Sequence, residues 1–331
     1  MQLELKDQLT MGTSMAGGGF AVRRKAARRF GSIAMLGACA MWLLLPAGNA
    51  RAGSVFVSVT RAVDEFSTDG TLIRTLTLGA GVSFSPTDMA FGKDGNLYVL
   101  DTFSDKLQKF NPATGAYLGS LGSFPTIAPR GITLGPDGNF YVDGLDGTIV
   151  QVNSTTGVTT SVFTNSGSTT DLAFIPGTSQ LVVIDGNAVC YVMNSPCVLS
   201  NPADVFATGF LDPKGLTFGP DGRLYAVGFQ DVRVAGKTGG AASLFTPINS
   251  VSDGNNLAFD GLGDLWVADG GSAKVEEFSS TGALLLSFNS SGGDPLGIAV
   301  STPEPASLLL FGSGLFVFAG MWRRWWSYSA A

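Results

Sequence analysis

The chain has 331 residues, of which 45% are apolar and 14% charged, and it contains no histidine. Without histidine, Ser-His-Asp and Cys-His catalysis and histidine-based zinc sites are excluded. Residues 53–300 carry 11 basic and 23 acidic side chains, and this negative balance disfavours binding to the phosphate backbone of a nucleic acid. The 45 glycines indicate many tight turns.

Residues 1–52 have the pattern of a secretory signal peptide with a long leader. A basic segment, 23–29, precedes the apolar run 33–45. Ala50-Arg51-Ala52 then supplies the small-residue pattern for cleavage before Gly53. Met1, Met11 and Met15 are each acceptable translation starts, and the last two give a more ordinary leader.

Three alternatives for this region remain open. A membrane anchor is disfavoured because the apolar run is short for a span. Arg28-Arg29-Phe30 is similar to the core of a twin-arginine signal, so the pattern does not decide between the general and the twin-arginine export routes. The segment 36–39 is similar to a lipobox, which would make Cys39 a lipidated N-terminus.

The body of the chain is built from a repeat. Six similar segments begin at residues 88, 131, 171, 215, 256 and 297, which are 40 to 44 residues apart. Each full unit has a short apolar strand, a turn such as Asp94-Gly95-Asn96, a second strand, an alternating third strand such as 106–110, and a fourth strand. Asp-Gly between apolar runs is a strong hairpin signal. Four strands in about forty residues predict the blade of a β-propeller.

The two ends of this region complete each other. The sixth unit stops after one strand, 298–300, and the three missing strands are expected at 55–59, 62–66 and 72–76. A blade shared by both ends closes a ring and leaves no exposed strand edge. The sequence therefore predicts an all-β fold, a six-bladed β-propeller over 53–300 that its own terminal strands close.

The unit also resembles the NHL repeat. The residues that carry the resemblance are Pro86, the Asp94-Gly95 turn, and the segments 98–101 and 107–110. It extends over about 55–300 and implies an NHL-like propeller. The third unit departs from the pattern, because Pro176-Gly177-Thr178 replaces its Asp-Gly turn.

Ligands of propellers usually bind at the mouth of the central channel, where the loops enter the first strands. The polar residues expected there are Asp88, Arg130, Asp171, Lys214 and Asn256. Asp88, Asp171 and Asn256 are candidate calcium ligands, since calcium prefers oxygen donors. The alternative is that these side chains only cap turns at strand entries. We assign no catalytic residue, and no cofactor other than this candidate calcium.

Cys190 and Cys197 are the only cysteines after residue 52. In an oxidising compartment they are expected to form a structural disulfide. The alternative is two buried thiols.

The last 31 residues form a separate segment, 301–331. Pro303-Glu304-Pro305 is followed by 306–322, which contains no charged residue, and then by Arg323-Arg324. This order predicts a transmembrane helix over 306–322 with the two arginines in the cytoplasm. It also resembles the PEP-CTERM sorting signal of Gram-negative bacteria. That resemblance implies processing near Pro303 by an exosortase-type transpeptidase, in bacteria that make exopolysaccharide and biofilm. The alternative is a plain membrane anchor.

Two functions remain open. The first is a non-catalytic protein of the cell envelope, outer surface or extracellular matrix of a Gram-negative bacterium, whose propeller binds exopolysaccharide or envelope proteins. The second is a calcium-dependent hydrolase resembling the gluconolactonase/regucalcin family, which uses a Glu–Asn–Asp set. The glutamates of 53–300 are Glu65, Glu276 and Glu277. All three fall in predicted third strands, away from the channel mouth, so the sequence favours the non-catalytic function.

Overall fold

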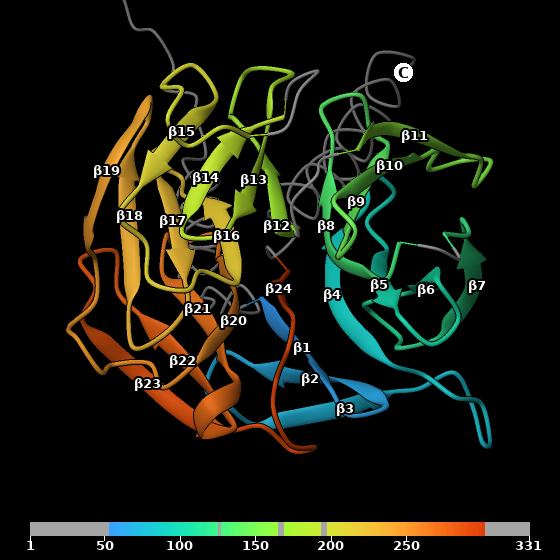
Figure 1. Cartoon of the computed structure of the whole chain (residues 1–331). Coiled ribbons are helices and arrows are strands. Elements are labelled where there is room, and N and C mark those ends of the chain that lie inside the picture. Colours follow the sequence, from blue (N-terminus) through green and yellow to red (C-terminus); the bar gives the residue numbers. More distant parts are fainter. Residues whose placement is uncertain (1–52, 125–126, 165–168, 193–196, 302–331) are drawn as a thin grey trace, which may run out of the picture. The chain divides into compact units, whose positions relative to one another are not determined.

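Figure 1 shows the computed structural model, which describes residues 53–124, 127–164, 169–192 and 197–301. Regular structure in these ranges is β-strand, apart from one turn of 3-10 helix, η1 (Gly270–Ser272). Within them, no helix has the length and hydropathy that a membrane crossing requires. The predicted signal peptide, 1–52, and the predicted membrane helix, 306–322, lie outside the described residues.

Three antiparallel sheets each take four strands in chain order. The first contains β4 (Pro86–Phe91), β5 (Leu97–Asp101), β6 (Lys106–Phe110) and β7 (Tyr117–Leu121). The second contains β8 (Pro129–Leu134), β9 (Phe140–Gly144), β10 (Thr148–Val152) and β11 (Thr159–Thr164). The third contains β20 (Gly254–Phe259), β21 (Leu265–Asp269), β22 (Lys274–Phe278) and β23 (Leu284–Asn289).

A fourth sheet joins the two ends of the described chain. Its strand order is β24-β1-β2-β3, with β24 (Ile298–Val300), β1 (Ser54–Val59), β2 (Ala62–Ser67) and β3 (Leu72–Leu76). Val55 pairs with Val300 and Val57 with Ile298. Beyond these pairs, the Ser301 amide donates to the Ser54 carbonyl oxygen at 2.9 Å. We call this β1–β24 pairing, with the Ser54–Ser301 contact, the terminal clasp. Its strands lie where the sequence predicts them, within one residue.

The remaining strands form one sheet of eight, in the order β12-β13-β14-β15-β19-β18-β17-β16. Their bounds are β12 (Thr169–Phe174), β13 (Leu181–Asp185), β14 (Ala188–Tyr191), β15 (Val205–Thr208), β16 (Gly215–Phe218), β17 (Leu224–Val227), β18 (Val232–Gly236) and β19 (Gly239–Leu244). A short parallel pairing of β15 with β19, through Ala207 and Gly240, joins two four-strand runs. The repeat does not predict this pairing. Its physical reason is the small residues of β19, because a Cβ on Gly239 would lie 1.9 Å from the Phe206 carbonyl oxygen.

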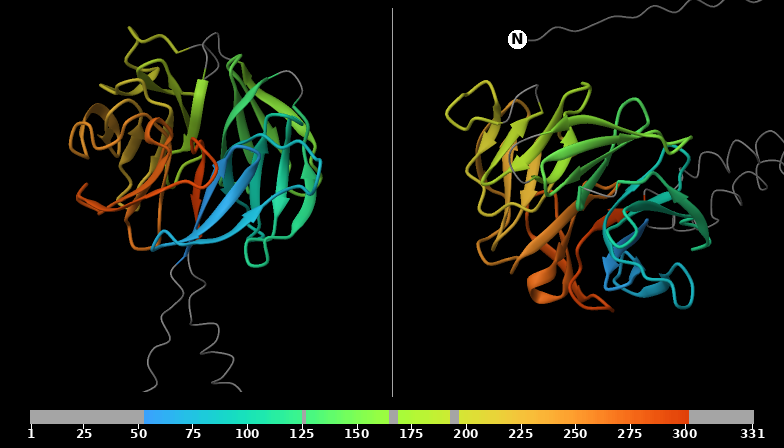
Figure 2. Two further views of the ribbon diagram at one scale, coloured as in Figure 1. Left: turned by 90° about the horizontal axis from the view of Figure 1, so that it is seen from below. Right: turned by 45° about the vertical axis from the view of Figure 1, so that its right-hand side comes forward.

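The sheets follow one another in a cycle. The first strands of the four-strand runs, β4, β8, β12, β16, β20 and β24, contact one another in that order, and β24 contacts β4. The hydrophobic clusters lie between consecutive runs; Phe56 of β1, for example, packs with Val99 of β5 and Phe110 of β6. Figure 2 shows the sheets from two further directions. The described region is thus an all-β, propeller-like fold, as the sequence predicts.

Burial follows from strand position. The second strands β5 and β21 are buried at every residue, whereas the fourth strands β7 and β23 are largely exposed. The turn between β4 and β5 needs glycine, because Gly95 has a φ of 75°, a conformation that other residues rarely adopt. Asp94 completes the turn by accepting the Asn96 amide at 3.1 Å.

Candidate functional site

Polar side chains and glycines alternate around the central channel. The six aligned positions lie in the first strands or, for the last, directly before one: Asp88, Gly131, Asp171, Gly215, Asn256 and Gly297. Asp88, Asp171 and Asn256 line one central cavity of about 250 Å³, together with apolar side chains of the same strands. The structure therefore brings together the three residues that the sequence proposes as calcium ligands.

The alternation has a steric cause. A Cβ on Gly131 would lie 2.6 Å from the Asp171 Oδ1 atom. A Cβ on Gly215 would lie 2.7 Å from the Asn256 Cα atom. Glycine at every second position thus leaves the space that the acidic or amide residue of the next run occupies, with its side chain at Gly131 and with its backbone at Gly215.

Asp88 links three first strands. One carboxylate oxygen accepts the Ile132 amide of β8 at 2.9 Å. The other accepts the backbone amide of Met89 at 2.7 Å and the side-chain amide of Asn256, in β20, at 2.8 Å. Asp171 repeats the arrangement, since it accepts the Leu172 amide at 2.8 Å and the Leu216 amide of β16 at 2.7 Å. These residues join strands of different runs, a role beyond the turn caps considered from the sequence.

Asp143 is a buried acid that the sequence analysis missed. It has no exposed surface. Its Oδ1 atom accepts the Gly131 amide at 2.6 Å, and its Oδ2 atom has no hydrogen-bond partner among the described residues. A signal existed, because Asp143 stands where other second strands carry Leu100, Ile184 or Ala268. We refer to Asp88, Asp143 and Asp171 as the buried acid cluster.

Burial dominates the titration of this cluster, because it disfavours the charged form of a carboxyl group. Burial raises the pKa of Asp143 to about 6. Burial, together with the charge of Asp143, raises the pKa of Asp88 to about 7. The pKa of Asp171 lies well above its usual range because of burial and the charges of Asp88 and Asp143. The cluster therefore takes up protons at a higher pH than exposed aspartates do.

The basic residues at the mouth behave differently from each other. Lys214 is half-buried, and its Nζ atom lies 2.6 Å from a carboxylate oxygen of Asp253. Arg130 is exposed and forms no ion pair or side-chain hydrogen bond within the described ranges. Lys214 thus holds two loops together, whereas Arg130 has no such contact and its charge acts on the Asp143 carboxyl group, whose pKa it lowers.

No glutamate of the described region lines the central cavity. Glu65 is buried in β2 and accepts the Ser54 hydroxyl at 2.7 Å. Glu276 is buried in β22, and burial with the charge of Asp269 raises its pKa to about 7. The Glu–Asn–Asp set of the hydrolase hypothesis is therefore not assembled at the channel.

A separate acidic group lies where β20 turns into β21. Asp260, Asp264 and Glu277 bring three carboxylates close together. Burial, then the charges of Asp264 and Asp260, raises the pKa of Glu277 to about 7. In the β4–β7 sheet, Lys109 occupies the position that corresponds to Glu277 and lies 2.7 Å from Asp94. The β20–β23 sheet thus carries an acid at the position where the β4–β7 sheet carries a base.

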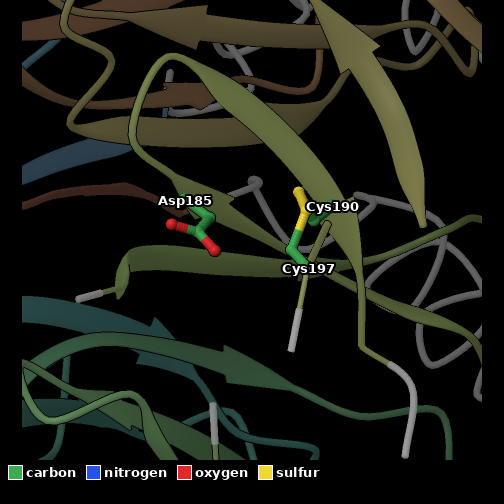
Figure 3. Close-up of side chains that lie close together, drawn as sticks. All are labelled: Asp185, Cys190 and Cys197. Carbon is green, nitrogen blue, oxygen red and sulfur yellow. A yellow bond between two sulfur atoms is a disulfide. The ribbon is translucent and has the colours of Figure 1, made fainter. Parts of the chain in front are cut away.

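Figure 3 shows the two cysteines, which are joined by a disulfide with Cα atoms 6.0 Å apart. Cys190 lies in β14, and Asp185, at the end of β13, lies nearby. Residues 193–196, between the cysteines, are outside the described ranges. A disulfide sulfur has no thiolate with which to bind a metal, so these three side chains do not form a metal site.

Of the predicted processing sites, Gly53 alone is described. It directly precedes the terminal clasp, in which the Ser54 amide also donates to the Ser301 hydroxyl at 2.7 Å. Ala50 and Ala52 of the cleavage pattern lie outside the described residues, as do Pro303, Glu304, Pro305, Arg323 and Arg324. The predicted sorting signal thus begins directly after the clasp.

Residues 301–324 match the PEP-CTERM protein-sorting motif. This motif indicates export and sorting to the bacterial cell envelope, and it implies processing by an exosortase. The match is confined to these residues and says nothing about the propeller. No curated protein matches the sequence.

Solved structures share the fold at low sequence identity. Virginiamycin B lyase from Staphylococcus aureus matches with a TM-score of 0.51 and 16% identity, over 76% of this chain and 89% of that one. A protein of unknown function from Bacteroides caccae matches with a TM-score of 0.56 and 15% identity, over 75% and 98%. The nidogen/laminin complex matches with a TM-score of 0.60 and 14% identity, over 75% and 98%. These neighbours are of the NHL or propeller type, and they support the fold alone.

Proposed function

We propose that this chain is an exported protein of the cell envelope or extracellular matrix of a Gram-negative bacterium, in which a propeller serves as a non-catalytic binding scaffold. A signal peptide, 1–52, is removed before Gly53. A membrane helix, 306–322, then holds the C-terminus until an exosortase acts near Pro303-Glu304-Pro305. The observation that carries the proposal is the sorting motif at 301–324.

The scaffold has six blades in this proposal. Its support is the cycle of six first strands in contact and the terminal clasp. The eight-stranded sheet then counts as two blades, β12–β15 and β16–β19, whose outer strands meet. A ring of this kind has little free strand edge, which suits a protein that must persist outside the cell. Its ligand is a polysaccharide or an envelope protein.

The calcium-dependent hydrolase is the weaker proposal on chemical grounds. Calcium takes six to eight oxygen ligands, but the carboxylate oxygens of Asp88 and Asp171 already accept backbone amides of neighbouring strands. The side-chain oxygen of Asn256 likewise accepts the Leu257 amide. These residues do not fit a calcium ion as they are arranged. Calcium titration followed by calorimetry, with a lactone and phosphoester screen, tests this directly. Tight binding with turnover would favour the hydrolase.

The sorting proposal is tested by the mass of the mature protein, expressed in a host with its exosortase and in a matched host without it. With the enzyme, the surface form should begin at Gly53 and lack Arg323 and Arg324. A Pro303→Ala/Glu304→Ala/Pro305→Ala variant should keep both arginines, whereas a Ser307→Ala control should be processed normally. A surface form that retains both arginines in the presence of the exosortase contradicts the proposal and leaves a simple anchor.

A further inference from the structure

Two adjacent cavities open on the face of the ring where loops enter the first strands. One, of about 460 Å³, is lined by Thr87, Asp105, Arg130 and Leu145, among others. The second, of about 300 Å³, is lined by Thr60, Arg61, Phe103 and Asp294, among others. Both volumes fall within the range of small-ligand sites, roughly 300–1,000 Å³.

The two cavities share a wall. Thr102 lines the first and Phe103 the second, and these are consecutive residues of the loop after β5. At the start of β4, Thr87 likewise lines the first cavity and Pro86 the second. We call the pair the double pocket. Because consecutive Cα atoms are about 3.8 Å apart, one extended ligand can cross the wall and enter both cavities.

Each half of the double pocket offers the same chemistry. Arg61 and Arg130 are exposed, and neither forms an ion pair or a side-chain hydrogen bond within the part of the chain that the structure describes. The other arginines there, Arg74, Arg223 and Arg233, are all paired with acids. In a body with a large excess of acid, two unpaired guanidinium groups on one face are distinctive. Arginine binds carboxylates through two parallel hydrogen bonds.

The remaining lining groups indicate a ligand that has other polar groups besides its negative charge. Asp105 and Asp294 accept no side-chain hydrogen bond within the described ranges, and Thr60 and Thr87 bring hydroxyl groups. Acceptors beside donors suit a ligand that carries hydroxyls as well as a negative charge. Phe103 is 66% exposed, and its ring offers an apolar surface against which the C–H face of a sugar can pack.

We propose that the double pocket binds an acidic polysaccharide, with one uronate-type sugar in each cavity. Two similar half-sites on one face match a ligand whose units repeat. This inference rests on the proposed scaffold function and specifies its ligand class. An acidic peptide is less suited, because extended peptides usually add to an open strand edge through backbone hydrogen bonds, and the double pocket is built from residues on loops and at strand ends.

The position of the double pocket is consistent with this role. β1 runs from Ser54, in the terminal clasp, to Val59, directly before Thr60 and Arg61. The double pocket and the chain ends therefore lie at opposite ends of this strand. The rise per residue of a β-strand gives a separation of about 17 Å between them. The double pocket therefore lies at the end of β1 opposite the point from which the chain continues toward the sorting motif.

The test uses the full-length chain in mild detergent and three probes of similar length. These are oligogalacturonate, its neutral methyl ester, and poly-glutamate. Calorimetry should show binding of oligogalacturonate alone, with affinity rising from the single sugar to the oligomer because two cavities are filled. Arg130→Gln and Arg61→Gln should each weaken binding about tenfold or more, and Phe103→Ala should also weaken it.

Lys237 provides the matched control. It is exposed in the turn between β18 and β19, at the opposite end of the strands, and Lys237→Gln should leave binding unchanged. The proposal is overturned if no probe binds, if poly-glutamate binds as tightly as oligogalacturonate, or if Lys237→Gln weakens binding as much as the arginine variants. None of these outcomes alters the mass of the processed C-terminus, so failure of the ligand and failure of the sorting proposal are distinguishable.

Discussion

Asp143→Asn tests the buried acid cluster through the pH dependence of stability. The pKa of Asp143 is raised to about 6 in the folded protein, mainly by burial, from its usual value of 3.8. Between these two pH values the folded state holds a proton that the unfolded state has lost. The stabilising contribution is therefore complete at low pH and disappears as the pH rises through the folded pKa.

The expected magnitude follows from the shift. Roughly two pKa units correspond to about 3 kcal/mol at 1.36 kcal/mol per unit. About 1.5 of these units lie above pH 4.5, so the wild-type free energy of unfolding should fall between pH 4.5 and pH 8 by on the order of 2 kcal/mol more than that of Asp143→Asn. The asparagine leaves an amide group without a partner, which costs about 1–3 kcal/mol. That cost is independent of pH and cancels in the comparison.

The assay is a urea titration at both pH values, followed by circular dichroism. Asp146→Asn serves as the control, because Asp146 is exposed in the neighbouring loop, and it should leave the pH dependence unchanged. Equal pH dependence in Asp143→Asn and wild type would refute the argument, since Asp143 would then titrate alike in the folded and unfolded states.

Changes at three further sites test the fold by urea denaturation. Glu277→Lys should stabilise the protein by roughly 1 kcal/mol, because it places a cation beside Asp260. Glu277→Gln should stabilise it less, because it only removes a charge. If both variants were less stable than wild type, the inferred repulsion among the three acids would be contradicted. Gly131→Ala should cost about 2 kcal/mol, since its Cβ would meet the Asp171 carboxylate; a neutral result would mean that the channel wall yields. Cys190→Ser/Cys197→Ser should lower the free energy of unfolding by about 2.5 kcal/mol, because the disulfide no longer restricts the unfolded chain. Reduction of the wild-type disulfide should lower it by the same amount.

The repeat pattern predicts the strands well because local signals specify them. The Asp94-Gly95 turn and the alternating segment 106–110 locate β4, β5 and β6 without reference to the rest of the chain. Even the long-range pairing of β1 with β24 follows from counting strands, because a ring with one incomplete unit must recruit its missing strands from the other end.

The contacts between runs are not predictable in this way. Asp88 is visible in the sequence as a polar residue at a strand entry, but its acceptance of the Ile132 amide depends on how two neighbouring runs are positioned. Asp143 breaks the apolar pattern of the second strands and could have been noticed. The parallel contact between β15 and β19 depends on a close backbone approach at Gly239, which no periodicity encodes.

The terminal clasp also determines how the molecule responds to mechanical load. Ser54 begins β1 and Ser301 follows β24, so both ends of the folded region leave from the same end of one strand pair. A force that pulls these ends apart acts across the hydrogen bonds and breaks them one at a time from Ser54 and Ser301 inward, which is an unzipping geometry. A protein tethered at its C-terminus alone carries no tension across this seam.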